Sequence, residues 1–136
     1  MLVVDSCGWL EWFTDGQLAE SYRPFLSEPE RLLVPAIVFY EVYKFLKREA
    51  GEEKALMAAA CMKSSTIVPA DDVLCLHAAD ISLKYGLAMA DAFVAATAKL
   101  HRAELITLDS DLKDFQSEVH PKEGGKEIEK FFFAPV

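Results

Sequence analysis

Short apolar runs alternate with helix-forming stretches along this chain, and the alternation limits the folds open to it. Each run has the length and composition of a buried strand. The expected strands are Leu2 to Asp5, Leu32 to Val34, Thr66 to Pro69 and Glu104 to Leu108. Because strands separated by helices form a parallel sheet covered on both faces, the pattern predicts a three-layer α/β/α fold with a central, mostly parallel sheet.

Capping and turn residues predict where the helices begin and end. Ser6 is expected to cap the first helix, Pro35 to precede the third, and Gly51 and Gly86 to stop two others. Asp71 or Asp72 is expected to cap the helix that Gly86 ends. The expected helices cover about residues 7–13, 17–26, 36–50, 52–62, 72–85 and 88–100.

The chain has 136 residues, of which 52% are hydrophobic. This size and composition predict one domain with a single core over residues 1–136, although the pattern does not assign the tail from about residue 120. Asp5 interrupts the N-terminal apolar run before it could form a signal-peptide core, and no later stretch suits a membrane span. We therefore expect a cytoplasmic protein that is not associated with a membrane.

Cys7, Cys61 and Cys75 are odd in number and far apart in the sequence. This spacing indicates neither a disulfide framework nor a zinc site. Because apolar or small residues surround them, we expect buried thiols that act as small hydrophobic side chains.

Acidic residues stand at positions where apolar segments end or turn inward. Asp5 ends the first strand, Glu41 lies near the apolar stripe of its helix, Asp91 lies among alanines, and Asp109 follows the last strand. A carboxylate beside an apolar face is costly unless something pairs with it. Ligands of parallel α/β sheets bind at the carboxyl ends of the strands, so these acids are expected to meet at one edge.

Such a cluster requires a cation. Two carboxylates about 4 Å apart repel by roughly 4 kcal/mol at an effective dielectric constant of about 20. Mg²⁺ or Mn²⁺ reverses this repulsion, because hard divalent ions prefer carboxylate ligands and retain water molecules that can be activated. The net charge of −8 argues against a broad basic nucleic-acid surface, but it allows an enzyme that approaches phosphate through metal ions.

Several segments resemble the PIN domain, specifically the VapC-type toxins. They are Val3-Val4-Asp5-Ser6, the helix with Glu41 after Pro35, the stretch Met89 to Ala98 around Asp91, and Leu105 to Leu112. The resemblance implies a Mg²⁺- or Mn²⁺-dependent endoribonuclease that hydrolyses RNA phosphodiesters with metal-activated water. It also implies a homodimer that is inhibited by a VapB-like antitoxin.

The resemblance also implies roles for individual residues. Asp5, Glu41, Asp91 and Asp109 match the family's metal-binding and catalytic acids. Auxiliary roles fall to Ser6, which would help to orient the site, to Thr107, which would position a carboxylate, and to Asp111.

Two other functions fit parts of the pattern. A receiver-like, Mg²⁺-binding signalling domain also carries acids at strand ends, but its phosphoacceptor would end a central strand, and the third strand here ends in Val68-Pro69. A PIN fold without catalysis could act only as a binding partner, which a complete set of acids disfavours.

The aromatic residues bear on assembly. Trp9, Trp12, Phe13 and the run Phe131 to Phe133 exceed what a small core hides, so some are expected at a dimer or antitoxin interface. The C-terminal run is longer than the family pattern, and it is interpreted either as a last edge strand or as a docking segment.

Overall fold

A four-stranded parallel sheet lies at the centre of the protein. The computed structural model describes residues 1–108 together with Leu112 and Phe115. The strands are β1 (Leu2–Val4), β2 (Leu32–Pro35), β3 (Thr66–Val68) and β4 (Glu104–Ile106), in the spatial order β3-β2-β1-β4. Leu2 pairs with Leu32 on one side and with Glu104 on the other, and all pairings are parallel. The predicted strands and sheet are confirmed.

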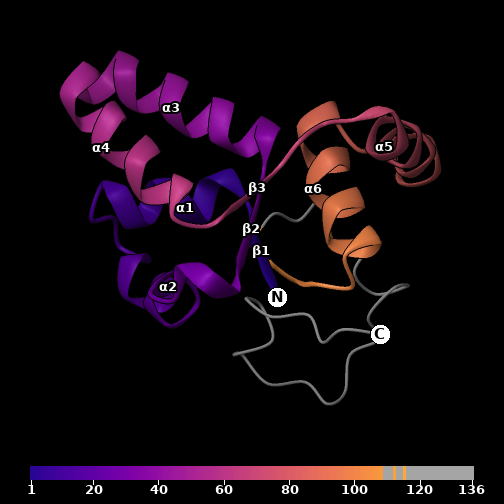
Figure 1. The fold of residues 1–136 in the computed structure, drawn as a ribbon, viewed down its shortest axis with the longest axis horizontal. Coiled ribbons are helices and arrows are strands. Elements are labelled where there is room, and N and C mark those ends of the chain that lie inside the picture. Colours follow the sequence, from indigo (N-terminus) through magenta and orange to yellow (C-terminus); the bar gives the residue numbers. More distant parts are fainter. Residues whose placement is uncertain (109–111, 113–114, 116–136) are drawn as a thin grey trace.

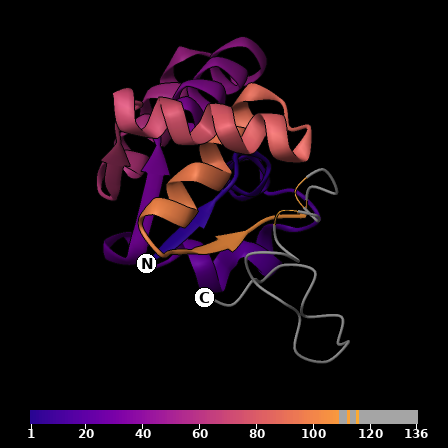
Figure 2. The same cartoon turned by 90° about the vertical axis from the view of Figure 1, so that its right-hand side faces the viewer.

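Helices cover both faces of this sheet. They are α1 (Ser6–Phe13), α2 (Ala19–Leu26), α3 (Ala36–Ala50), α4 (Glu52–Lys63), α5 (Asp72–Tyr85) and α6 (Met89–Leu100), with a short 3₁₀ helix, η1 (Pro29–Arg31), before β2. In Figure 1, α1 to α4 lie on one side of the strands and α5 and α6 on the other. Figure 2, turned by 90°, shows α6 crossing in front of the strands. The three-layer α/β/α prediction is therefore confirmed.

The N-terminus of α1 differs from the prediction. The capping residue is Asp5, whose carboxylate accepts a hydrogen bond from the backbone N–H of Gly8, and Ser6 is the first helical residue. The carboxylate has this reach because an N-cap side chain faces the N–H three residues ahead. The end of β1 and the start of α1 thus share one acidic residue.

Other helix ends follow the predicted chemistry. Asp71 caps α5 by accepting from the N–H of Leu74 at 2.9 Å, and Gly86 ends it in the left-handed conformation with φ of 67°. Gly51 has φ of 94° and separates α3 from α4. Helix α2 starts at Ala19 rather than near residue 17, and Pro24 lies inside it.

The cysteines are exposed, so the prediction of buried thiols is wrong. All three are free. Each lies on a helix whose buried stripe is formed by its neighbours, such as Trp9 in α1, Met62 in α4 and Leu74 in α5. Helical phase, rather than the apolar character of the adjacent sequence, therefore decides which side chain is buried.

The N-terminal aromatic residues pack in the hydrophobic core or against it. Trp9 is only 2% exposed, and its ring stacks on Phe13 at a centroid distance of 5.7 Å. Trp12 and Phe13 are partly buried against the core. Trp9 is therefore a core residue rather than an interface residue, whereas Phe131 to Phe133 lie outside the described residues.

No single helix within the described residues is long and apolar enough to cross a membrane. The pair α5 and α6 passes that test together by length and composition, with a bend of 114° between its members.

Candidate functional site

The candidate site lies where the strand order reverses. The chain proceeds from β1 outward through β2 to β3 and then returns to place β4 on the other side of β1. A parallel sheet opens a crevice beyond the carboxyl ends of its strands at such a switch point. Asp5 directly follows β1 and Thr107 directly follows β4, so both stand at this crevice.

Asp5 is held by hydrogen bonds to both carboxylate oxygens. Oδ1 accepts from the backbone N–H of Gly8 at 3.0 Å, and Oδ2 accepts from the hydroxyl of Thr107. Asp5 is 5% exposed and Thr107 is 1% exposed. Donors from α1 and from the residue after β4 therefore hold both oxygens of this buried carboxylate in a fixed orientation.

Glu41 approaches the same position from α3. It is partly buried, and burial raises its pKa above the usual value for glutamate. The negative charge of Asp5 raises this pKa further, while a hydrogen bond with the side chain of Ser6 opposes the shift. Asp5 and Glu41 therefore lie within electrostatic reach of each other, with Ser6 beside them.

Two residues that support Asp5 were not identified in the sequence. Tyr22 of α2 is 1% exposed, and burial and then the charge of Asp5 raise the pKa of its phenol strongly. A Cβ placed on Gly8 would lie 2.5 Å from Val4 Cγ1 and 2.6 Å from Tyr22 Cε1, so only glycine fits there. The sequence did contain a signal for Gly8, because a glycine in the first turn of an apolar helix lowers helix stability by about 1 kcal/mol relative to alanine. A glycine at such a position indicates that close packing leaves no room for a side chain.

The remaining predicted acids are placed less completely. Asp91 is partly buried in the first turn of α6, where the helix dipole favours a carboxylate. Asp109 and Asp111 lie outside the described residues. Within residues 1–108, 112 and 115, no three His, Cys, Asp or Glu side chains form a group able to hold a metal ion. The described part of the chain thus brings together Asp5, Glu41, Ser6 and Thr107.

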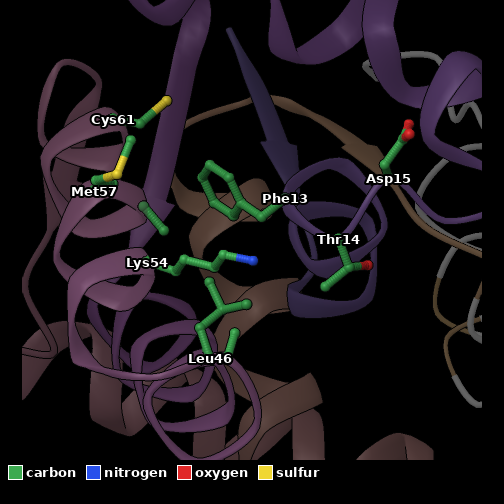
Figure 3. A pocket seen from close by; sticks show the side chains of 9 residues that line it. Phe13, Thr14, Asp15, Leu46, Lys54, Met57 and Cys61 are labelled. Atoms are coloured by element: carbon green, nitrogen blue, oxygen red, sulfur yellow. The ribbon is translucent and has the colours of Figure 1, made fainter.

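Two hollows adjoin these elements. A cavity of about 250 Å³ opens beside Glu41, and its wall includes Ser6, Leu10, Tyr40, Lys44, Phe45 and Arg48. A larger groove of about 690 Å³ separates the end of α1 from α3 and α4. In Figure 3, the Lys54 side chain extends from α4 toward the end of α1, beside Phe13.

Comparison with known proteins agrees with this architecture. The chain is similar to a solved structure of a toxin–antitoxin complex from Klebsiella pneumoniae, with 24% identity and a TM-score of 0.69 over 82% of this chain and 90% of that chain. It is also similar to the structure of Mycobacterium tuberculosis VapC20, a sarcin–ricin loop cleaving toxin, with 18% identity and a TM-score of 0.72 over 85% of this chain and 95% of that chain. A third similar structure is VapBC2 from Rickettsia felis bound to a promoter DNA fragment, with 11% identity and a TM-score of 0.66 over 83% of this chain and 91% of that chain.

No curated protein matches the chain. A family model described as the PIN domain matches residues 2–117, which include β1 to β4 and α1 to α6. With the fold and the strand-end carboxylates in place, this match shows that the chain belongs to the PIN domain family.

Proposed function

We propose that this protein is a metal-dependent endoribonuclease and the toxin of a type II toxin–antitoxin pair. The observation that carries the proposal is the closeness of Asp5 and Glu41 at the switch point, where burial and, to a smaller extent, the charge of Asp5 raise the pKa of Glu41. The family match favours a nuclease over a receiver-like domain. The matches to a toxin–antitoxin complex from Klebsiella pneumoniae and to the Mycobacterium tuberculosis toxin VapC20 support the toxin role.

The residues present suit a hard divalent cation. Asp5 offers a buried carboxylate that is held in a fixed orientation, and Glu41 offers a second carboxylate whose ionisation a nearby cation would favour. We propose that Asp5, Glu41, Asp91 and Asp109 hold Mg²⁺ or Mn²⁺. When bound, such an ion lowers the pKa of a water molecule and neutralises negative charge on the phosphate.

The other residues at the site position these carboxylates. Thr107 and the N–H of Gly8 fix both oxygens of Asp5, and Ser6 fixes Glu41. We therefore propose Ser6 and Thr107 as positioning residues, with water rather than a side chain as the nucleophile. Asp111 remains a proposed auxiliary residue.

Cleavage of labelled RNA by purified protein tests this proposal. We expect activity with Mg²⁺ or Mn²⁺ and none with a chelator. Asp91→Asn should lower the cleavage rate at least about 100-fold and leave the circular dichroism spectrum unchanged, because a metal ligand or its orienting charge is lost. Full activity of this variant would contradict the proposal that Asp91 belongs to the metal site. A well-folded wild type that is inactive on all RNAs with either metal would instead indicate a binding protein.

We propose that the antitoxin docks in the groove between α1, α3 and α4. Its walls carry the apolar side chains of Phe13, Leu46 and Met57, and Met57 is 67% exposed. Exposed apolar surface of this kind marks a protein-binding site. Met57→Glu should therefore weaken capture of the VapB-like product of a neighbouring reading frame at least about tenfold, whereas Leu56→Glu, exposed on α4 outside the groove, should not. Equal loss in both variants would contradict this docking site.

We also propose that the toxin is a homodimer. Helix α5 exposes Val73, Leu76 and Leu83 by 53%, 69% and 86%, and their spacing places them on one side of the helix. Sedimentation at tens of micromolar should show a dimer for the wild type and a monomer for Leu76→Glu combined with Leu83→Glu. A monomeric wild type would contradict the proposal.

We further propose that residues 1–136 form one PIN-like domain and that the protein acts in the cytoplasm.

A further inference from the structure

The outer face of α3 combines aromatic and basic side chains beside Glu41. Tyr40, Lys44 and Arg48 are spaced four residues apart and form one row, and Glu41 and Phe45 form the adjacent row. Successive members of a row are separated by about 6 Å along the helix axis. All five line the cavity of about 250 Å³ that includes Ser6. A basic and aromatic surface thus continues directly from the carboxylate site.

The aromatic residues on this face are exposed and each carries a cation over its ring. Tyr40 is 55% exposed, and Lys44 Nζ lies 5.5 Å from its ring centroid. Phe45 is 36% exposed, and Arg48 Cζ lies 5.6 Å from its ring centroid. Core packing does not account for rings held at the surface in this way. An aromatic ring next to a cation is the combination that binds an unpaired base and its phosphate.

The charges on this face are available to a ligand. Lys44 forms no ion pair with any described residue, in contrast to Lys47, whose Nζ lies 3.6 Å from Glu52. Among the residues that the structure describes, Arg48 forms an ion pair only with the exposed Glu49, at 2.9 Å, and an exposed pair of this kind holds its members weakly. In a chain with a net charge of −8, two cations beside a carboxylate site provide a local attraction for a polyanion.

We infer that the Tyr40, Lys44 and Arg48 row of α3 binds a single-stranded segment of the RNA next to the bond that is cleaved. Lys44 and Arg48 contact phosphates, and the ring of Tyr40 stacks on one unpaired base. A double helix does not suit this face, because its bases are stacked on one another and closed to the ring. The inference rests on the proposed nuclease function and assigns the substrate form and its positioning residues.

Binding without cleavage tests the inference separately from the nuclease function. Fluorescence anisotropy in chelator would measure the affinity for a labelled single strand of roughly ten nucleotides, which suits one binding site. Tyr40→Ala should weaken binding at least about fivefold, and Tyr40→Phe should stay within about twofold of the wild type, because the ring remains. The corresponding duplex should bind more weakly and should not distinguish these two variants.

Salt dependence tests the phosphate contacts. Lys44→Gln combined with Arg48→Gln should reduce the slope of log affinity against log salt by about 1.4, since each contact with a single strand contributes about 0.7. Lys47→Gln, which removes a lysine of the same helix that lies outside the cavity, should leave the slope unchanged.

Three results of the binding experiments would overturn the inference, and a fourth concerns the antitoxin. They are a wild type that does not bind the oligomer at low salt, equal binding by Tyr40→Ala and Tyr40→Phe, and an unchanged salt slope in the doubly substituted variant. Variants that bind RNA normally but lose the antitoxin would assign this face to a protein partner and also overturn it. If the expected binding pattern appears in a protein that cleaves no RNA, the nuclease proposal fails and the inference stands.

Discussion

The two carboxylates of the candidate site are held in different ways. Asp5 is buried, caps α1, and uses both oxygens to accept hydrogen bonds from Gly8 and Thr107. Glu41 lies on α3 at the edge of an open cavity, and Ser6 is its neighbour there. Asp5 therefore has a structural role in addition to its proposed role in the site, whereas Glu41 has only the proposed role. Substitutions of Asp5 and Glu41 are therefore expected to lower activity to a similar extent, but only a substitution of Asp5 is expected to lower the stability of the fold.

The largest expected effect is on activity. Asp5→Asn and Glu41→Gln should each lower metal-dependent RNA cleavage at least about 100-fold, because each removes a proposed metal ligand. Only Asp5→Asn should also lower the melting temperature, since an amide cannot accept from both Gly8 and Thr107 as a carboxylate does. Cleavage rates and thermal melts of the two variants would check this. Similar losses of stability would break the comparison.

The next effect concerns the packing behind Asp5. Gly8→Ala should reduce the free energy of unfolding by about 1–3 kcal/mol, because the added methyl group would overlap Val4 and Tyr22. Denaturant unfolding would measure the loss. Cys7→Ala, at the exposed neighbouring position, should change the free energy by no more than about 0.5 kcal/mol. An unchanged Gly8→Ala variant would show that α1 shifts freely against β1.

A smaller loss is expected at the end of β4. Thr107→Val keeps the shape of the side chain but removes the hydroxyl that donates to Asp5, so stability should fall by about 1–2 kcal/mol. Thr107→Ser retains the donor and should retain more of the stability and activity. If valine and serine behave alike in unfolding experiments, the hydroxyl contributes nothing to holding Asp5.

The smallest effect is a pH dependence from Glu41. Burial and Asp5 raise its pKa in the folded protein, so between the unfolded and folded pKa values the folded state holds more protons than the unfolded chain. Stability of the metal-free wild type should therefore fall as the pH rises through that window. Glu41→Gln should be more stable above it, by about 0.5 kcal/mol after solvent screening, with the advantage vanishing below it. The free energy of unfolding would be measured in chelator at a series of pH values from acidic to neutral. A wild type that becomes more stable than Glu41→Gln as the pH rises would contradict this prediction.

The sequence predicted the scaffold well because its signals are local. Alternating apolar runs indicated β1 to β4, and Asp71, Gly51 and Gly86 marked helix ends through their own capping and backbone preferences. The order β3-β2-β1-β4 depends on contacts between distant segments, and the strand-by-strand pattern did not specify it. The exposure of Cys61 likewise depends on helical phase within the complete fold.

The sequence pointed to Asp5 and Glu41 and, through the family resemblance, to Ser6 and Thr107, but it did not point to Gly8 and Tyr22. Asp5 and Glu41 stood out because carboxylates are costly beside apolar segments. The ring of Tyr22 reaches Gly8 only because α2 packs against α1 and β1, a contact that no local pattern records. The role of Asp5 as helix cap was missed because the following serine offered an equally plausible cap.

Calorimetric titration with Mn²⁺ tests most directly whether the buried and the open carboxylate share one cation. We predict saturable binding to the wild type, and binding at least about tenfold weaker in both Asp5→Asn and Glu41→Gln, as expected for the loss of a ligand. Glu53→Gln, an exposed substitution in the first turn of α4, should bind as the wild type does. Wild-type affinity in Glu41→Gln would contradict the account, because Asp5 and Glu41 would then not belong to one metal site.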